Sequence, residues 1–220
     1  LTPYVSYAES FVPLIGRKFG GGFFEPQEGE MSEAGFKYQA PGTSLVINSA
    51  IYDLTESNRL ATDLAHPDFQ IQTGAVNVRG FEIEAAGRLT SELKIIASYS
   101  YTDARYEGGD KKGFQVESVP EHLAAFWAVY DFHTPALDGW SVGGGARYVG
   151  TSLDGLDEIK TPAVGLFDAM IAYENDEWRW SLNGTNLTNE EYLSTCIGGI
   201  SGTCYNGTLR TITTGLTYKF

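Results

Sequence analysis

Alternation of apolar and polar side chains at every second residue runs through most of this chain, and it constrains the fold more than any other feature. In the segment LKIIASYSY, Leu93, Tyr99 and Tyr101 share one face, while Lys94 and Ser98 lie on the other. A period of two residues indicates a β-strand whose two faces meet different surroundings. The pattern recurs in EAGFKY, GFEIEAA, WSVGGGARY, LFDAMIAY and WRWSLNGTN, so the sequence predicts an all-β protein.

Two further segments are predicted as strands without an assignment of faces. In HLAAFWAVYDF both faces are apolar, and in SLVINSAIYDL the phase of the alternation is mixed. With these two, the expected strands are about ten, near residues 1–8, 29–40, 44–55, 69–86, 91–104, 119–132, 139–150, 164–174, 177–187 and 209–220.

The connections between these strands alternate in length. Short links at PGT, RLTSE, HTPALDG and NDE separate long ones at 9–28, 56–68, 105–118, 151–163 and 188–208. An antiparallel meander of this kind has its short turns at one end and its long loops at the other. That is the layout of a transmembrane β-barrel with short periplasmic turns and long extracellular loops.

Composition and charge exclude several other classes of protein. The net charge of −13 argues against nucleic acid as a partner, because phosphate backbones are bound through clustered Lys and Arg. The longest apolar run is the eight residues of LAAFWAVY, too short for a membrane-spanning helix. The opening LTPYVSYAESF has neither a basic nor an apolar leader region, so no signal peptide is expected in it.

The last strand carries an apolar file that we expect to face lipid. Its members are Ile212, Leu216, Tyr218 and Phe220. Lipid cannot satisfy stray backbone groups, so a spanning sheet must pair along its full length and show the bilayer apolar side chains. The alternative is a water-soluble antiparallel barrel or sandwich with the same file facing inwards; aromatic residues at strand ends and long loops on one side favour the membrane.

The C-terminal run NGTNLTNEEYLSTCIGGISGTCYNGTLRTITTGLTYKF resembles the end of a TonB-dependent siderophore receptor. Members of that family have an Asn-Leu-aromatic-Asp-Lys-Glu-Tyr type turn there, then a loop with two cysteines and a last strand ending in Phe. This sequence departs from the pattern at Thr188, Asn189 and Asn206. Matching segments occur upstream in the same order: PYVSYAESFVP, GEMSEAGFKYQ, QTGAVNVRGFEIEAAG, IASYSYTDA, VPEHLAAFWAVYDF and GGGARYVGTS.

The resemblance implies a fold and a function for the whole chain. Residues 1–220 would form about the last ten strands of a barrel of about 22, without the plug domain. The receptor would lie in the outer membrane of a Gram-negative bacterium and import a ferric siderophore, its transported ligand, with energy relayed through TonB. TonB would engage the N-terminal part that this chain lacks. We expect a hydroxamate siderophore, no bound cofactor and no enzymatic activity.

The last long loop contains the candidate site residues. Receptors of this family cradle siderophores with aromatic side chains from such loops, so Ile197, Tyr205 and Asn206 are candidate ligand contacts; packing of Tyr205 within its own loop is the alternative. Cys196 and Cys204 are the only cysteines, and their even number in a segment facing an oxidising compartment favours a disulfide. A metal pair is the rival, but no histidine lies nearby in sequence.

A different class of function is a small complete outer-membrane barrel with a hydrolase or adhesin role. A hydrolase would need an Asp and His cluster at the outer rim, and the sequence offers His66 and His122 there, with Asp63, Asp68 and Asp103 as possible partners. The spacing of these residues does not pair them.

Overall fold

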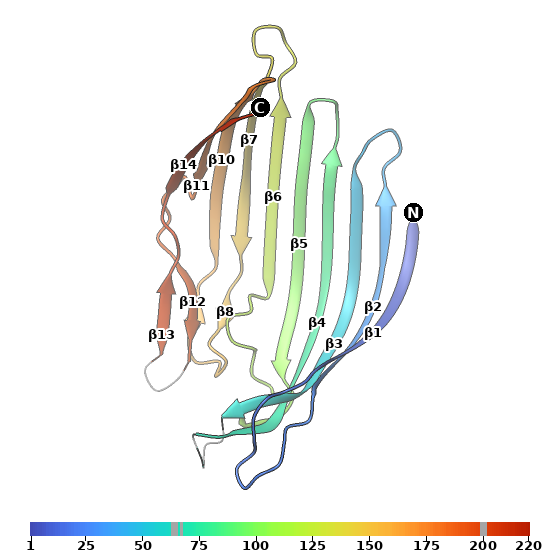
Figure 1. Ribbon diagram of the computed structural model, residues 1–220, viewed down its shortest axis with the longest axis vertical. Helices are drawn as coiled ribbons and strands as arrows, with labels where there is room; N and C mark the ends of the chain where they lie inside the picture. The colour runs from blue at the N-terminus through green and yellow to red at the C-terminus, as the bar shows by residue number, and fades with distance from the viewer. Residues whose placement is uncertain (63–65, 67, 199–201) are drawn as a thin grey trace.

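Ten antiparallel strands form one continuous sheet in the computed structural model, which describes residues 1–62, 66, 68–198 and 202–220 (Figure 1). The strands cross the sheet in chain order, with β7 next to β10 and β11 next to β14. Their bounds are β1 Thr2–Val12, β2 Gln27–Gln39, β3 Val46–Thr62, β4 Gln70–Arg88, β5 Leu93–Tyr106, β6 His122–Asp131, β7 Trp140–Val149, β10 Val164–Glu174, β11 Trp178–Thr185 and β14 Thr211–Tyr218.

The long connections contain structure that the sequence pattern did not predict. Two small hairpins stand in them, β8 (Ser152–Leu153) with β9 (Lys160–Thr161), and β12 (Leu193–Ile197) with β13 (Thr203–Asn206). Strands of two to five residues are too short to show a period. The one helix among the described residues is the single 3-10 turn Gly109–Lys111, and no described helix is long and apolar enough to cross a bilayer.

The expected alternation of connection length is confirmed except after β3, because β3 runs to Thr62 and β4 begins at Gln70, which leaves a connection shorter than link 132–139. Links 40–45, 89–92, 132–139 and 175–177 lie at one end of the sheet, and the connections after β1, β3, β5, β7 and β11 lie at the other. Figure 1 shows the long connections at the bottom and the short turns at the top. We call these the long-loop end and the short-turn end.

β1 and β3 reach farther towards the long-loop end than expected, whereas β4 begins close to the expected residue 69. β1 pairs with β2 as far as Val12 opposite Gln27, and β3 and β4 continue to pair with each other to Thr62 opposite Gln70. The register of β3 shifts between Glu56 and Arg59, where Asn58 adopts a φ of 59°. This irregularity interrupts the alternation of side chains, so the sequence pattern ended the strand too early.

Register assigns the two faces of the sheet, because residues directly opposite each other in antiparallel strands share a face. One row of opposed residues is polar over most of its length: Lys37, Asn48, Glu84, Ser98, Ala125 and Arg147. The adjacent row on the other side is largely apolar: Phe36, Ser49, Ile83, Tyr99, Ala124 and Tyr148. We call these the polar face and the apolar face.

The two segments with ambiguous faces are resolved by the same register. In β6, Leu123, Ala125 and Trp127 lie on the polar face, and Ala124 and Phe126 lie on the apolar face. Trp127 and Leu123 therefore explain why both faces of β6 look apolar in the sequence. In β3, Asn48 and Ala50 are on the polar face, and Ile47, Ser49 and Ile51 are on the apolar one.

Aromatic rings on the polar face lie over glycines of neighbouring strands. A Cβ at Gly80 would lie 2.4 Å from the Tyr52 ring, and a Cβ at Gly145 would lie 2.6 Å from the Trp127 ring. The Tyr52 hydroxyl lies 3.3 Å from Thr102 Oγ1, so the ring extends across β4 to β5. Glycine here allows the ring to cover the backbone, an arrangement that stabilises sheets at positions without a side chain.

The sheet is a single layer and leaves much apolar surface uncovered. On β14, Leu216 is 67% exposed and Ile212 is 57% exposed. β1 and β14 each pair with one neighbour and not with each other, so the ten strands do not close into a barrel. Such a surface is stable only against an apolar environment or further strands.

Candidate functional site

Three of the long connections form one hydrogen-bonded unit, which we call the long-loop cluster. It comprises residues 107–121, 150–163, 186–198 and 202–210. The first two connections are joined by bonds from Ser118 N to Leu153 O (3.0 Å) and from Gln115 N to the Asp157 carboxylate (3.0 Å). The third is joined to the second by a bond from Cys196 N to Thr161 Oγ1 (3.0 Å). The cluster therefore has a fixed arrangement that local loop sequence alone would not give.

The β12–β13 hairpin carries a disulfide. Cys196 and Cys204 stand opposite each other in the hairpin register and are joined by a 2.03 Å S–S bond. Cys196 is fully buried. The bridge closes a short hairpin in the long-loop cluster. Such a bridge stabilises the folded hairpin mainly by lowering the conformational entropy of the unfolded chain.

The hairpin register separates the three candidate ligand contacts. Tyr205 stands opposite Thr195, and Ile197 stands opposite Thr203, so Ile197 and Tyr205 lie on one face of the hairpin. Asn206 lies on the other face with Cys204. Tyr205 is 52% exposed and Ile197 is 38% exposed, so both side chains present apolar surface to whatever approaches that face.

Asn186 fixes the base of this loop, a role that sequence reasoning missed. Its side-chain amide donates to Glu190 O (2.9 Å) and Thr208 O (3.1 Å), and its Oδ1 accepts from Glu190 N (2.8 Å). Asn186 is 2% exposed and has a φ of 50°. Asn tolerates this left-handed conformation better than most residues. Two Asn three residues apart directly after a strand were the signal available in the sequence.

An ion pair on the polar face supports the same loop base. The Arg147 guanidinium donates from Nε to Asp168 Oδ2 (2.6 Å) and from Nη2 to Asp168 Oδ1 (3.0 Å). Asp168 Oδ1 also accepts the backbone N–H of Asn186 (2.9 Å). A bidentate guanidinium–carboxylate pair has a defined geometry, so it orients Asn186 relative to β7 and β10.

Asp154 is buried at the centre of the long-loop cluster. Its Oδ1 accepts hydrogen bonds from the N–H groups of Leu156 and Glu158, both at 3.1 Å. The residue is 1% exposed. Burial alone would raise the pKa of Asp154, but the backbone N–H groups of Leu156, Glu158 and Ile159 hold this pKa below its ordinary value. The second carboxylate oxygen has no hydrogen-bond partner among the described residues.

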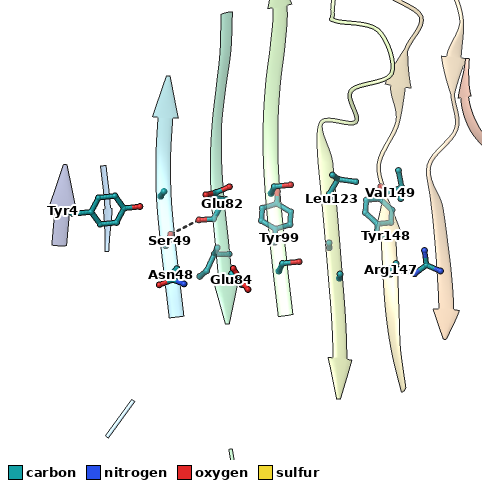
Figure 2. Close-up of a pocket in the computed structure, with 16 residues that line it drawn as sticks. Tyr4, Asn48, Ser49, Glu82, Glu84, Tyr99, Leu123, Arg147, Tyr148 and Val149 are labelled. Atoms are coloured by element: carbon teal, nitrogen blue, oxygen red, sulfur yellow. Dashed lines mark hydrogen bonds between the residues drawn. The ribbon is translucent and has the colours of Figure 1, made fainter. Parts of the chain in front are cut away.

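A cavity of about 490 Å³ lies along the polar face. Figure 2 shows its lining from β1 to β7, with Glu82 and Glu84 from β4 in the centre and Arg147 at one side. Among the described residues, no cation forms an ion pair with Glu82 or Glu84. The face is thus an acidic, water-accessible surface, and within the described ranges no group of three or more metal-ligating side chains could hold a metal ion.

The residues of the hydrolase hypothesis are not assembled into a catalytic pair. His122 Nδ1 lies 3.0 Å from the Tyr99 hydroxyl, and its ring lies 5.2 Å from that of Tyr101. Asp103 pairs with Arg105 at 2.8 Å. His66 stacks on Phe19 with a centroid distance of 3.3 Å, and Asp68 is exposed. Asp63 lies outside the described residues.

Comparison with known proteins identifies relatives over the full length of the chain. The family model for the TonB dependent receptor-like β-barrel matches residues 1–187. The ferrichrome outer membrane transporter and phage receptor of Escherichia coli K12 is 34% identical over 100% of this chain and 30% of its own length. The ferrioxamine B receptor of Salmonella typhimurium LT2 is 30% identical over 100% of this chain and 32% of its own length.

Solved structures share the fold. The ferric-catecholate import receptor Fiu of Escherichia coli K12 has a TM-score of 0.79 at 26% identity, covering 99% of this chain and 33% of its own. The ferric yersiniabactin uptake receptor FyuA of Yersinia pestis has a TM-score of 0.83 at 16% identity, which speaks for the fold alone. The chain therefore spans about a third of the length of these relatives.

Proposed function

The chain belongs to the TonB-dependent receptor β-barrel family, and on this premise we propose that the protein containing it imports ferric siderophores across the outer membrane. The observation that carries the proposal is similarity over the whole chain to receptors for ferrichrome and for ferrioxamine. Both ligands are hydroxamate complexes, which supports a hydroxamate as the natural ligand. Energy would come from TonB through the part of the receptor outside this chain.

In this function the sheet supplies part of the barrel wall. The apolar face would contact membrane lipid, and the polar face would line the lumen. Register supports this assignment for the last strand, because Ile212, Leu216 and Tyr218 share the face of Phe167 and Trp178. Phe220 follows β14, and its ring packs against Tyr218 at 5.2 Å. Aromatic rings at this end would lie at the membrane interface.

The long-loop end would face the outside and contribute to siderophore capture. Ile197 and Tyr205 lie on one face of the disulfide-closed hairpin, and we propose that this face contacts the ligand. Asn206 lies on the opposite face, so the proposed contact face does not include it. The disulfide and Asn186 would hold the hairpin in place, which reduces the entropy lost on binding.

Uptake by living cells tests the proposed function. A Gram-negative strain without its own hydroxamate receptors would express the full-length receptor, and we expect radioactive iron to accumulate from ferrichrome or ferrioxamine B. Deletion of TonB should abolish this accumulation. Uptake from a ferric catecholate alone would overturn the hydroxamate assignment, and uptake from none of the three would overturn the siderophore function.

Substitutions in the hairpin test the ligand contacts. Tyr205→Ala and Ile197→Ala should each weaken ferrichrome or ferrioxamine binding by about tenfold. Each substitution removes an apolar contact whose burial contributes about 1–2 kcal/mol to the binding free energy. Asn206→Ala is the matched control from the other hairpin face and should bind within about twofold of the unsubstituted receptor. Equal affinity of all three variants, measured by fluorescence quenching on purified receptor, would argue against this contact face.

A further inference from the structure

A shallow groove follows β7 on the apolar face, between β6 and β10. Phe126 of β6 and Phe167 of β10 both stand directly opposite Ala146 of β7, so two rings flank one methyl group. The groove has a volume of about 320 Å³. Figure 1 shows the three strands next to one another. Neighbouring strands are about 4.8 Å apart, so the two rings rise from strands about 10 Å apart and leave the groove between them.

The groove is uncovered among the described residues and is open towards the long-loop end. Phe126 and Phe167 are both half-exposed, although each is a large apolar side chain. Towards the long-loop end, Tyr148 of β7 stands opposite Ala124 and Gly165. A Cβ at Gly165 would meet no atom within 4 Å. A molecule can therefore enter the groove past Gly165.

The groove lies at the depth of the membrane hydrocarbon. Aromatic rings mark the interfaces near both ends of β6, since His122 lies beside Tyr101 towards the long-loop end and Tyr130 packs against Phe132 towards the short-turn end. Phe126 is four residues from His122 and four from Tyr130, which is ~14 Å from each at ~3.4 Å per residue. Water is absent at this depth, so only an apolar group can fill the groove.

A hydrocarbon chain should bind in this groove more firmly than on the flat surface around it. In lipid, burial of apolar area gives no hydrophobic gain, so association depends on packing contacts. A chain between Phe126 and Phe167 meets protein on three sides, and each added carbon contact contributes dispersion energy. Ala97 shows the flat case at the same depth. It also stands opposite Phe126, but its other neighbour is Ala85, so a second ring is missing there.

We propose that this groove binds one acyl chain of an outer-leaflet glycolipid in a fixed position. The groove is continuous with the surface that would meet the bilayer, and it opens towards the long-loop end, which belongs to the outer leaflet. In a Gram-negative outer membrane that leaflet consists of glycolipid with saturated chains, which are straight enough to follow one strand. Tyr148 would lie near the chain's carbonyl group, with its hydroxyl available as a hydrogen-bond donor. The inference rests on the proposed membrane position of the sheet and is independent of the siderophore.

Native mass spectrometry of the full-length receptor tests the proposal. Receptor purified in detergent is incubated with lipid A, the acylated glycolipid, or with phosphatidylethanolamine, and the bound lipid is counted. Ala146→Leu fills the floor of the groove and should lower bound lipid A by about tenfold, since the displaced chain loses its packing against both rings. Gly165→Leu fills the outer end and should act in the same direction. Ala97→Leu adds the same side chain beside Phe126 outside the groove, and should leave the bound amount nearly unchanged.

Loss of lipid A in both groove variants, with retention in Ala97→Leu, supports the proposal. Equal retention in Ala146→Leu and the unsubstituted receptor overturns it, as does an equal loss in Ala97→Leu, which would show general adhesion to the apolar face. A loss of phosphatidylethanolamine alone overturns the glycolipid source. A lipid-free dimer that Ala146→Leu converts to a monomer would show a second copy in the groove instead.

Heat-modifiable mobility on gels should confirm that each variant is folded. Ferrichrome uptake is measured separately on the unsubstituted receptor, so a failure of the proposed transport function would leave the result on lipid binding intact.

Discussion

At the scale of single residues, a few buried polar side chains organise the long-loop end. Asn186 makes three side-chain hydrogen bonds to the backbone of its own loop, and Asp154 accepts backbone N–H groups inside the long-loop cluster. Buried polar groups that are hydrogen-bonded favour one arrangement of a loop, because other arrangements break those bonds; Asp154 acts in this way through Oδ1, while its Oδ2 has no partner among the described residues. These residues do not touch the proposed ligand face, and we expect them to act by positioning it.

Asn186→Ala should open the base of the last loop. The change removes the partner of Glu190 N, Glu190 O and Thr208 O, and an unsatisfied buried backbone group costs about 1–3 kcal/mol. Amide hydrogen exchange at Glu190, which loses its acceptor, should therefore accelerate, and exchange at Arg210 should follow because its N–H donates to Asn189 Oδ1 in the same loop base. Glycine adopts the positive φ of residue 186 without strain but lacks the amide side chain. If exchange at Glu190 accelerates in Asn186→Gly as much as in Asn186→Ala, the acceleration comes from the lost hydrogen bonds and not from backbone strain. Asn183→Ala, which loses one bond of 3.4 Å, is the control and should leave these rates unchanged.

The Asp154 carboxylate makes the long-loop cluster sensitive to acid. Its pKa in the folded protein lies below its ordinary value of 3.8, so its ionised form stabilises the cluster. That contribution is complete above pH 3.8 and is lost as the pH falls through the lower folded pKa. Exchange at Gly198 N, which donates to Asp154 O, should accelerate in that window after correction for intrinsic rates. If Asp154→Asn shows the same pH dependence, another group is responsible.

At the scale of elements, close contacts between neighbouring strands limit the size of the side chain that fits at a given position of the sheet. The Tyr52 ring covers Gly80 and reaches Thr102, so three neighbouring strands are linked on the polar face. In the β12–β13 hairpin, the pairing register of the two strands places Ile197 and Tyr205 on one face.

Gly80→Ala should destabilise the barrel by about 1–3 kcal/mol, as expected for overpacking. Its Cβ would lie 2.4 Å from the Tyr52 ring and 2.6 Å from the backbone oxygen of Tyr101. Urea unfolding of the full-length receptor, followed by its heat-modifiable mobility on gels, measures the change. Gly215→Ala meets its nearest atom at 3.5 Å and should be nearly neutral. Combining Gly80→Ala with Tyr52→Ala should recover less than the full loss, since the Tyr101 contact remains; complete additivity would contradict the proposed packing.

At the scale of the whole molecule, the sheet has two chemically different faces and two open edges. The apolar face carries exposed side chains such as Phe126 (49% exposed) and Phe167 (53% exposed), which is unfavourable in water and favourable in lipid. The polar face carries the acidic cavity around Glu82 and Glu84. The same strands therefore separate a lipid surface from a wet interior once the barrel is complete.

Phe126→Arg and Ala125→Arg place the same charge on opposite faces of β6 at nearly the same depth. If the apolar face meets lipid, Phe126→Arg should cost about 2–4 kcal/mol near the bilayer midplane, whereas Ala125→Arg should cost much less. Unfolding of the receptor in liposomes measures both. Comparable losses for the two variants would contradict the assignment of faces.

The sequence by itself determined the strands, their antiparallel order and, apart from the connection after β3, the alternation of short and long connections, because a period of two is a local property of the chain. It also placed two cysteines in one loop, where the structure joins them, and its resemblance to TonB-dependent receptors agrees with the family shown by comparison. Only the tertiary structure decided how far β1 and β3 extend, which residues share a face in β6 and in the β12–β13 hairpin, and which loops form the long-loop cluster. Those features depend on cross-strand register and on hydrogen bonds between residues distant in sequence, such as Asn186 with Thr208, which no local pattern encodes.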